Sequence, residues 1–294
     1  MASETPIPGK TGDRLADRLR ALTWGLLWGL PWGAMALVSL YVSVASGIIV
    51  ALQYQPDTAY HSVVMLDQLV PYGAFARSLH FYASQVFFLL LIVHFLAVIP
   101  RFSEMDQAEY LRLLATIPVT VLLLFTGYVL RADHTGASAG RIAEAIILTI
   151  PFFGGILDKL FVAISSHGLH RIFLHHLVTL GLIFLLFVWR HLHRYRVATG
   201  EYLWLVAALV LFCAFVPAPI DADRLGAAVI TGPWFFLGIQ EALRYLPTLL
   251  AGIALPASLL VALAFFPGKY RRPASLFAFF WLLVYAALSL AGIR

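Results

Sequence analysis

The segment PYGAFARSLHFYASQVFFLLLIVHF, residues 71–95, decides the fold, because it places His80 and His94 inside one long apolar run. A second apolar run holds His176 and His191. The spacings of 14 and 15 residues correspond to about 21 and 22 Å along a helix. At about 100° per residue, each pair returns to within about 60° of one helix face. Two neighbouring helices can therefore face each other with two stacked His–His sites at different membrane depths.

These paired histidines indicate a specific chemistry. Imidazole is the commonest metal ligand, and a flat metal macrocycle held between two helices takes one imidazole from each side. A polar side chain deep in lipid is costly and usually functional. The pattern therefore predicts a diheme electron-transfer protein of the membrane.

The other six histidines fit this geometry less well. His175 lies about 160° out of phase with His191, so the two cannot face one partner. His175 is in phase with His193, but their rise of about 27 Å overshoots the 21 Å of the first helix. We expect His193 to be interfacial, and we expect solvated positions in outer loops for His61, His167 and His170.

The composition is that of a membrane protein. Of the 294 residues, 61% are hydrophobic and 12% charged, and the mean hydropathy is +0.87, far beyond a soluble domain. Seven apolar runs are candidates for crossing a bilayer: 32–53, 78–99, 113–130, 173–189, 202–219, 245–266 and 274–292. The fifth is the weakest, because Pro217 and Pro219 close it early. We therefore expect an all-α membrane protein with about seven transmembrane helices.

The runs suggest three parts. Residues 1–30 form a cytoplasmic N-terminus, in which the basic stretch 11–22 has leucines at helical spacing and suits an amphipathic surface helix better than a cleaved leader. Residues 31–200 form a diheme four-helix bundle, and residues 201–294 a three-helix C-terminal part. Three longer connections fall on the outer side, which predicts a substrate pocket open to that side.

Charge and cysteine content narrow the function. More than half of the 20 Lys and Arg residues fall in short segments on one side, which places the N-terminus in the cytoplasm by the positive-inside rule. The net charge of +5 is thus a signal of topology and does not indicate a nucleic-acid partner. The lone Cys213 excludes a disulfide framework and a zinc or iron–sulfur cluster built by this chain alone.

Two arginines lie close to the predicted heme sites. Arg77 comes three residues before His80, and Arg171 five before His176, both at the expected outer edge. The planar guanidinium fork binds carboxylates in a bidentate manner, which suits the two propionates of a heme. The alternative is ordinary interfacial anchoring by arginine.

The chain resembles the cytochrome b family of the cytochrome bc and plastid-type quinol oxidoreductases. Gly33, Gly47 and Gly127 resemble family glycines beside the hemes, and segment 71–95 is similar to the family's second helix. TGYVL at 126–130, IPFFG at 150–154 and HRIFLHH at 170–176 resemble further family segments, and Arg196 resembles a basic residue of the short form. GPWFFLGIQEALRYLP at 232–247 is similar to the outer quinol-site segment Pro-Glu-Trp-Tyr and its following helix. This likeness suggests a short-type cytochrome b fused to the three-helix quinol-site subunit.

The resemblance implies a mechanism and partners. Quinol would be oxidised near the outer surface, with one electron passing to a Rieske iron–sulfur protein. The other would cross the membrane through two b hemes, an outer one held by His80 and His176 and an inner one held by His94 and His191. A c-type cytochrome, a homodimeric multisubunit complex and the bacterial inner membrane are also implied.

The chain departs from the family at the quinol site. The usual Glu of Pro-Glu-Trp-Tyr is Pro233, which removes one obvious proton acceptor. We expect Trp234, Phe235 and the corner at Pro151 to wall an apolar quinone cavity, and His134 or Glu241 to take over one proton transfer. A fourth family glycine is replaced by Leu113.

Two other functions stay open at this stage. The chain could be a diheme membrane anchor that links the quinone pool to a non-Rieske periplasmic oxidoreductase. It could also be a transporter or structural membrane protein whose histidines are incidental, in which case purified protein would show no b-heme absorbance. The quinone, the electron acceptor and the direction of electron flow are not determined by the sequence.

Overall fold

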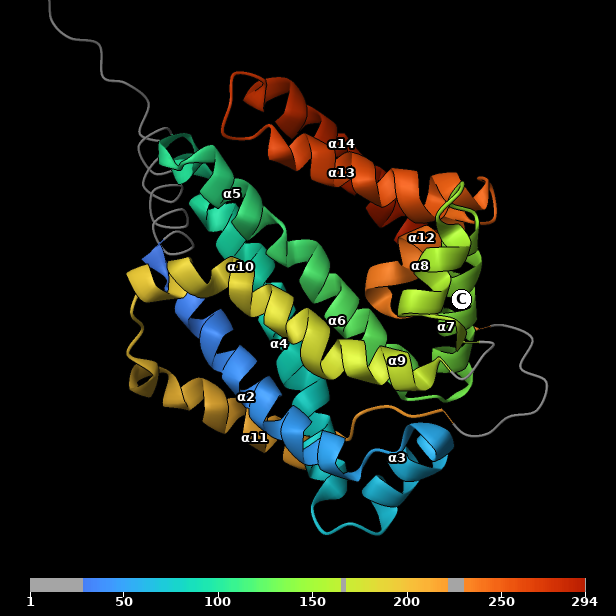
Figure 1. Ribbon diagram of the computed structural model, residues 1–294. Coiled ribbons are helices and arrows are strands. Elements are labelled where there is room, and N and C mark those ends of the chain that lie inside the picture. The colour runs from blue at the N-terminus through green and yellow to red at the C-terminus, as the bar shows by residue number, and fades with distance from the viewer. Residues whose placement is uncertain (1–28, 165–167, 222–229, 294) are drawn as a thin grey trace, which may run out of the picture.

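The computed structural model describes residues 29–164, 168–221 and 230–293, and these fold into helices joined by turns and loops (Figure 1). The amphipathic helix expected at residues 11–22 lies outside the described residues. The α-helices are α2 (Trp32–Gln53), α3 (Ala59–Gln68), α4 (Gly73–Val98), α5 (Gln107–Leu114), α6 (Thr116–Leu130), α7 (His134–Leu148), α8 (Gly154–Phe161), α9 (Leu169–Leu174), α10 (Leu180–Arg194), α11 (Leu203–Phe215), α12 (Leu237–Ala242), α13 (Leu255–Ala264) and α14 (Arg271–Ala291).

Short tighter or wider turns extend several of these helices. The 3-10 turns span Pro56–Thr58, Ile99–Glu104, Thr199–Tyr202 and Trp234–Phe236. Two π-helical turns span His175–Thr179, between α9 and α10, and Leu250–Ala254, before α13.

The membrane class is confirmed. Within the described chain, five helical stretches are long and apolar enough to cross a bilayer: Trp32–Gln53, Gly73–Glu104, Gln107–Leu130, Leu169–Arg194 and Arg271–Ala291. The other two predicted helices occur as the shorter apolar stretches Thr199–Phe215 and Leu250–Ala264. The first of these ends two residues before Pro217, as expected from a residue that cannot continue a helix. The protein is a multi-pass membrane protein.

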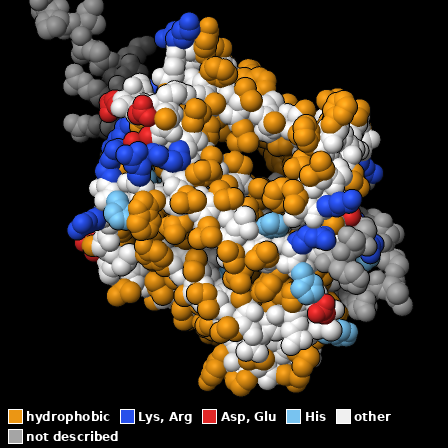
Figure 2. Space-filling model, viewed as in Figure 1, with side chains coloured by type: hydrophobic (Ala, Val, Ile, Leu, Met, Phe, Trp, Pro, Cys, Tyr) orange, Lys and Arg blue, Asp and Glu red, His pale blue; other side chains and the backbone are white. Residues whose placement is uncertain are grey.

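The surface has the character expected of such a protein. Large apolar side chains are exposed along every long helix, for example Leu52, Leu186 and Leu290 at 77%, 71% and 70%. In Figure 2 these side chains cover the middle of the molecule, while Lys and Arg gather toward its two ends. The same view shows a hollow between α6 and α13.

Helices α2, α4, α6 and α10 form a bundle, and α12, α13 and α14 form a second group beside it (Figure 1). Helix α11 packs on α2 and α4, so this element of the predicted C-terminal part lies against the bundle. One buried cluster takes a residue from each bundle helix, namely Ala36, Phe87, Val119 and Phe184. This apolar layer lies midway along the helices that carry the four histidines.

Local sequence explains where helices begin and break. Asp133 caps α7, because its carboxylate accepts a hydrogen bond from the Gly136 amide at 2.9 Å. Helix α7 therefore begins at His134, directly after this cap. Pro118 has no amide hydrogen to donate to the turn before it, which accounts for the break between α5 and α6 at Ala115.

Candidate functional site

The bundle brings the four predicted histidines into two pairs. The rings of His80 on α4 and His176 in the π turn lie with centroids 6.1 Å apart and are nearly perpendicular, at 87°. The rings of His94 on α4 and His191 on α10 lie 6.2 Å apart at 56°. The layer between them contains Phe87 and Phe184, whose rings are in edge contact at 5.8 Å. Two similar sites are thus stacked along the bundle.

The separation within each pair fits a six-coordinate metal bound from both sides. A metal–imidazole bond is about 2 Å, and the ring centre lies about 1.2 Å behind the nitrogen, so one metal ion between two imidazoles that both point at it sets the centroids about 6.4 Å apart. The observed separations of 6.1 and 6.2 Å lie close to that value. The geometry therefore fits a heme iron in each pair.

The outer histidines are held with one ring nitrogen free. His80 Nδ1 lies 2.8 Å from the Ser43 carbonyl, which can only accept, so Nδ1 carries the proton and donates. The Thr126 hydroxyl lies within donating distance of the Leu122 and Leu123 carbonyls, and His176 Nδ1 lies 2.9 Å from the same oxygen. His176 Nδ1 is therefore the donor to Thr126. Both rings keep an unprotonated Nε2, the nitrogen that a metal needs.

Three of the four rings lie against a glycine of a neighbouring helix. A Cβ on Gly33 would lie 2.9 Å from the His94 ring. One on Gly47 would lie 2.7 Å from the His80 ring, and one on Gly127 would lie 3.0 Å from His176. These contacts are tighter than van der Waals packing allows, so a side chain at these positions would displace the ring. The predicted glycines thus give the imidazoles their space.

The π turn explains the unequal spacing of the two histidine pairs. An α-helix of 15 residues rotates about 100° further than one of 14. The turn His175–Thr179 directly follows α9 and contains His176, and a π turn accommodates one extra residue without breaking the helix. The 15-residue spacing therefore behaves like the 14-residue spacing of α4. The sequence showed the difference of one residue between the two spacings, but it did not show the π turn that compensates for it.

Three of the other described histidines, His170, His175 and His193, have partners away from the two pairs. His175 Nε2 lies 2.9 Å from the Leu160 carbonyl, and Nδ1 lies 3.1 Å from the Thr179 hydroxyl, which uses both ring nitrogens. His193 stacks on Trp189 at 4.3 Å near the end of α10. His170 lies 3.5 Å from Asp57 in an exposed pair. His193, His170 and His61 are exposed, as predicted, but His170 and His61 lie on α9 and α3 and not in loops, and His167 falls outside the described residues.

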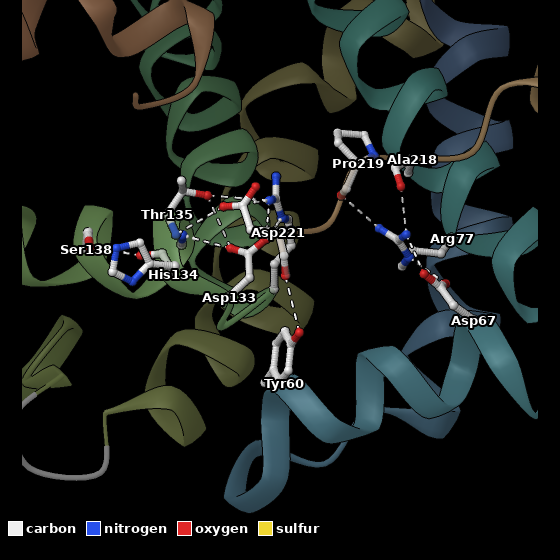
Figure 3. A network of polar contacts seen from close by, with 12 residues as sticks. Tyr60, Asp67, Arg77, Asp133, His134, Thr135, Ser138, Ala218, Pro219 and Asp221 are labelled. Atoms are coloured by element: carbon white, nitrogen blue, oxygen red, sulfur yellow. Dashed lines mark hydrogen bonds and ion pairs between the residues drawn. The ribbon is translucent and has the colours of Figure 1, made fainter. Parts of the chain in front are cut away.

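The two arginines near the outer pair differ. Arg77 is buried and forms an ion pair with Asp67, and it also donates to the carbonyls of Ala218 and Pro219 (Figure 3). It therefore ties α3 and the chain after α11 to α4, which takes up most of its donors. Arg171 has a buried Nη1 without a hydrogen-bond partner among the described residues. An orphaned guanidinium hydrogen of this kind suits an anionic group such as a heme propionate. Arg196 lies exposed beyond the end of α10.

A polar network closes the C-terminal end of α6 and the start of α7 (Figure 3). The carboxylate of Asp133 is fully buried and pairs with Arg131. It also accepts from the Asp221 amide at 3.0 Å, while the Thr135 amide donates to Asp221. Because both Asp133 oxygens already accept bonds, this carboxylate is not a free proton acceptor. The His134 ring points away from that carboxylate, and its buried Nε2 has no partner in the described chain.

The predicted quinol segment lies against the bundle. Trp234 donates from Nε1 to Gln85 Oε1 at 2.8 Å, and its ring lies 5.9 Å from that of Phe88. The Phe235 ring lies 6.5 Å from Phe88, and Phe236 lies 4.9 Å from Phe125, one residue before Thr126. The segment thus contacts α4 and α6 close to the outer histidines.

Other parts of the expected quinone cavity are less clearly gathered. Pro151 is exposed at the corner after α7. Two cavities within the described chain, of about 430 Å³ around Val129 and His170 and about 340 Å³ between α13 and α14, include neither Trp234 nor Pro151 in their walls. The shared cavity of Trp234, Phe235 and Pro151 stays a prediction.

Glu241 is a buried carboxylate on α12. Its side chain is only 4% exposed, and Arg244 lies 3.4 Å from one of its oxygens. The Tyr245 hydroxyl donates to the other oxygen at 3.0 Å, and Tyr245 is itself 71% exposed. Glu241 therefore pairs with Arg244 and also accepts from a hydroxyl on an exposed tyrosine.

Sequence reasoning missed several residues that position the site. Ser43 and Thr126 orient the outer imidazoles, Asp67 engages Arg77, and Gln85 binds Trp234. A polar residue inside an apolar helix often has a structural or functional role of this kind. Gln85 and Thr126 are both such residues, so the sequence could have pointed to them.

Comparisons with known proteins agree with this geometry. The family described as "Cytochrome b/b6/petB" matches residues 21–198. "Cytochrome b6" of Heliobacterium mobile is 27% identical over 170 residues, covering 55% of this chain and 80% of that protein. "Cytochrome b/c1" of Bradyrhizobium diazoefficiens is 27% identical over 296 residues, covering 83% of this chain but only 43% of that protein. A chain of a solved structure titled "Hyperthermophilic respiratory Complex III" has the same fold, with a TM-score of 0.67, 20% identity and 90% of this chain and 83% of that chain covered.

Proposed function

Because this chain belongs to the cytochrome b family, whose match spans more than half of it, we propose that it is the diheme cytochrome b subunit of a bc-type quinol oxidoreductase. In this proposal it oxidises quinol on the outer side and passes electrons across the membrane through two heme sites. The observation that carries the proposal is the pair of His–His separations of 6.1 and 6.2 Å, stacked within one bundle.

The chain's own residues would hold the two hemes. His80 and His176 would ligate the outer one through Nε2, with Ser43 and Thr126 keeping the proton on Nδ1. His94 and His191 would ligate the inner one. Bound hemes supply one-electron carriers at two depths of the membrane. The layer of Phe87 and Phe184 excludes water between the sites.

Further groups would complete the heme sites. Gly33, Gly47 and Gly127 leave room for the rings, and Arg171 offers an unpaired guanidinium hydrogen to an outer propionate. Arg77 is the weaker candidate for that role, because Asp67 already neutralises it. Arg196, exposed beyond α10, could serve only an anionic group near the inner surface.

The quinol would bind beside Trp234 and Phe235, on the face of α4 that bears Phe88. Oxidation of a quinol releases two protons, and the usual carboxylate is replaced by Pro233. Glu241 and His134 are the proposed acceptors. Glu241 is supported by its burial and by the Tyr245 hydroxyl that links it to the surface, and His134 by its buried, unpartnered Nε2.

Partners and location follow from the same proposal. The relatives named cytochrome b/c1 and respiratory Complex III support assembly into a multisubunit complex in a quinone-containing membrane. We expect a Rieske iron–sulfur protein, a c-type cytochrome and a second copy of this chain in the assembly. We place the protein in the bacterial inner membrane, with the N-terminus in the cytoplasm.

A second function is favoured by one observation, the proline in place of the quinol-site carboxylate. The chain could instead be a diheme anchor that connects the quinone pool to a non-Rieske periplasmic oxidoreductase. The two functions differ in the subunits that accept the electrons.

The experiment is to purify the intact complex through this chain and to measure heme content, subunits and quinol-dependent reduction of a c-type cytochrome together. The proposal expects two b-type hemes per chain, a Rieske subunit and steady turnover. A complex that holds both hemes, lacks a Rieske subunit and reduces another periplasmic partner would replace it with the anchor function. A complex without b-heme would refute both.

A further inference from the structure

Gln85 is a polar residue in the middle of the membrane-spanning helix α4, five residues after His80 and nine before His94. At about 100° per residue it lies about 140° around the helix from His80 and on the opposite face from His94. The helix therefore presents its histidines to the heme sites on one side and Gln85 to the C-terminal part on the other. The bond from Trp234 to Gln85 agrees with this orientation.

That bond fixes which way the amide of Gln85 points. The indole Nε1 of Trp234 can only donate, so the group facing it at 2.8 Å must be the carbonyl oxygen of Gln85. The amide nitrogen, with its two hydrogens, then points away from the indole. Among the residues that the structure describes, this nitrogen has no hydrogen-bond partner, and the Gln85 side chain is partly accessible.

An unpaired amide donor at this depth needs a partner that is not part of the described chain. Leaving a polar hydrogen unsatisfied in an apolar medium costs several kcal/mol, and lipid chains offer no acceptor. The surroundings are aromatic, with Phe88 and Trp234 at 5.9 Å and Phe235 at 6.5 Å from Phe88, and Trp234 is 48% exposed. The site thus combines flat apolar walls with one directed donor.

We infer that the Gln85 amide binds an oxygen of the quinone ring beside Trp234, as the polar contact that orients the substrate. A benzoquinone or naphthoquinone has two carbonyl oxygens that accept hydrogen bonds and a flat ring that packs against aromatic side chains. This inference rests on the proposed function for the location of the quinol site. It adds a polar residue to a site whose other named contacts, Phe88, Trp234 and Phe235, are aromatic.

This contact has a second consequence for the site. The amide oxygen of Gln85 accepts a bond from Trp234 while its nitrogen donates to the quinone, so one residue fixes the positions of both the aromatic wall and the substrate. Helix α4 also carries His80 and His94, so substrate and heme ligands share one rigid element. Changing Gln85 therefore weakens substrate binding without removing an imidazole.

The test is equilibrium binding of oxidised decylubiquinone and of menadione to the purified, heme-loaded complex, followed through the perturbation of the outer heme's absorption band. Loss of one hydrogen bond is worth about 0.5–1.5 kcal/mol, so Gln85→Met should raise the Kd of at least one of the two quinones about 2- to 12-fold. The quinol KM should rise by the same factor while both heme spectra stay unchanged. Trp234→Phe removes the indole donor but leaves the amide, and should raise the Kd less.

Ser84→Ala is the matched control, because within the described part of the chain the Ser84 hydroxyl bonds only to the Phe81 carbonyl of its own helix, and its Kd should equal that of the parent. Unchanged binding in Gln85→Met would overturn the inference, as would an equal rise in Gln85→Met and Trp234→Phe, which would make Gln85 a support for Trp234 alone. If Gln85→Met loses heme, Gln85→Asn is measured in its place. This variant keeps an amide but shortens its reach, so a raised quinone Kd supports the inference and an unchanged Kd overturns it. A parent protein that binds quinone through Gln85 yet oxidises no quinol would refute the proposed function and leave this inference standing.

Discussion

The four-helix bundle and the C-terminal group of helices differ in how narrowly their predicted functions restrict the residue type at each position. The bundle places four imidazoles in two pairs, with nearly the same separation within each pair, and a glycine lies against three of the four rings. The family match ends at residue 198, close to where the bundle ends. The C-terminal group lies outside that match, has Pro233 where the resemblance leads us to expect a carboxylate, and has one predicted span, at Leu250–Ala264, that is short.

This contrast has a physical origin. Metal coordination accepts few residue types and tolerates errors of only a few tenths of an ångström, so each ligand and its supporting groups are required individually. An apolar quinone pocket is a packing problem that many combinations of side chains solve. The bundle should therefore respond abruptly to small changes of register, and the C-terminal group more gradually.

The largest expected effect is a change of register between the two ligands of one helix. Deletion of Leu89, an exposed residue of α4, would shorten the spacing from His80 to His94 to 13 residues and rotate His94 by about 100° away from its partner. We expect the inner heme to be lost. Deletion of Val178 removes a residue from the π turn, which can revert to a regular α-helical turn, so His191 keeps its direction.

Heme content of the two deletion variants, measured by pyridine hemochrome and by difference spectra, is the readout. Two hemes in the Val178 deletion and one or none in the Leu89 deletion support the role given to the π turn. Equal loss in both would show that the turn does not absorb the extra residue.

The next effect concerns proton transfer at the outer site. If Glu241 or His134 accepts a quinol proton, its replacement by Gln should slow quinol oxidation by about 100-fold, the low end of general-base contributions. Both hemes should remain. Rates are measured for the parent and both variants, and a loss confined to one variant would select that residue as the acceptor. Parent rates in both variants would exclude both residues.

A smaller effect is expected from crowding an outer ligand. Gly47→Leu places a Cβ 2.7 Å from the His80 ring, and overpacking of this kind costs about 2 kcal/mol, or about 30-fold in the retention of the outer heme. Gly181→Leu is the control, because a Cβ there meets no atom within 4 Å. The heme dissociation rates of the two variants should differ accordingly, and similar rates would remove the role assigned to Gly47.

Much of the bundle could be predicted from the sequence. The periodicity of His80 with His94 and of His176 with His191 selected four of the ten histidines, and the structure brings these four into two pairs. Their role as heme ligands stays a prediction. His175 was excluded by its phase, and it is indeed engaged by Leu160 and Thr179. Spacing works here because a helix converts sequence separation directly into distance and direction.

Other parts could not be predicted, since they depend on contacts between segments distant in sequence. Nothing near Arg77 in the sequence indicated that Asp67 and two carbonyls after α11 would engage it. The bond from Trp234 to Gln85 joins residues 149 positions apart. The π turn at His176 departs from the regular rotation of an α-helix. It depends on the packing of two helices, in which the two histidine rings must face one another.

The account rests on two b-type hemes held by separate histidine pairs, and one measurement tests this most directly. A redox titration of the parent protein and of His191→Leu, followed by dithionite-reduced minus oxidised spectra, should show two b-type hemes with separate midpoint potentials in the parent. The variant should lose the inner heme and keep the outer one. Loss of both hemes to an equal extent in a variant that is still folded and membrane-inserted, or loss of neither, would contradict the pairing of His94 with His191 and of His80 with His176.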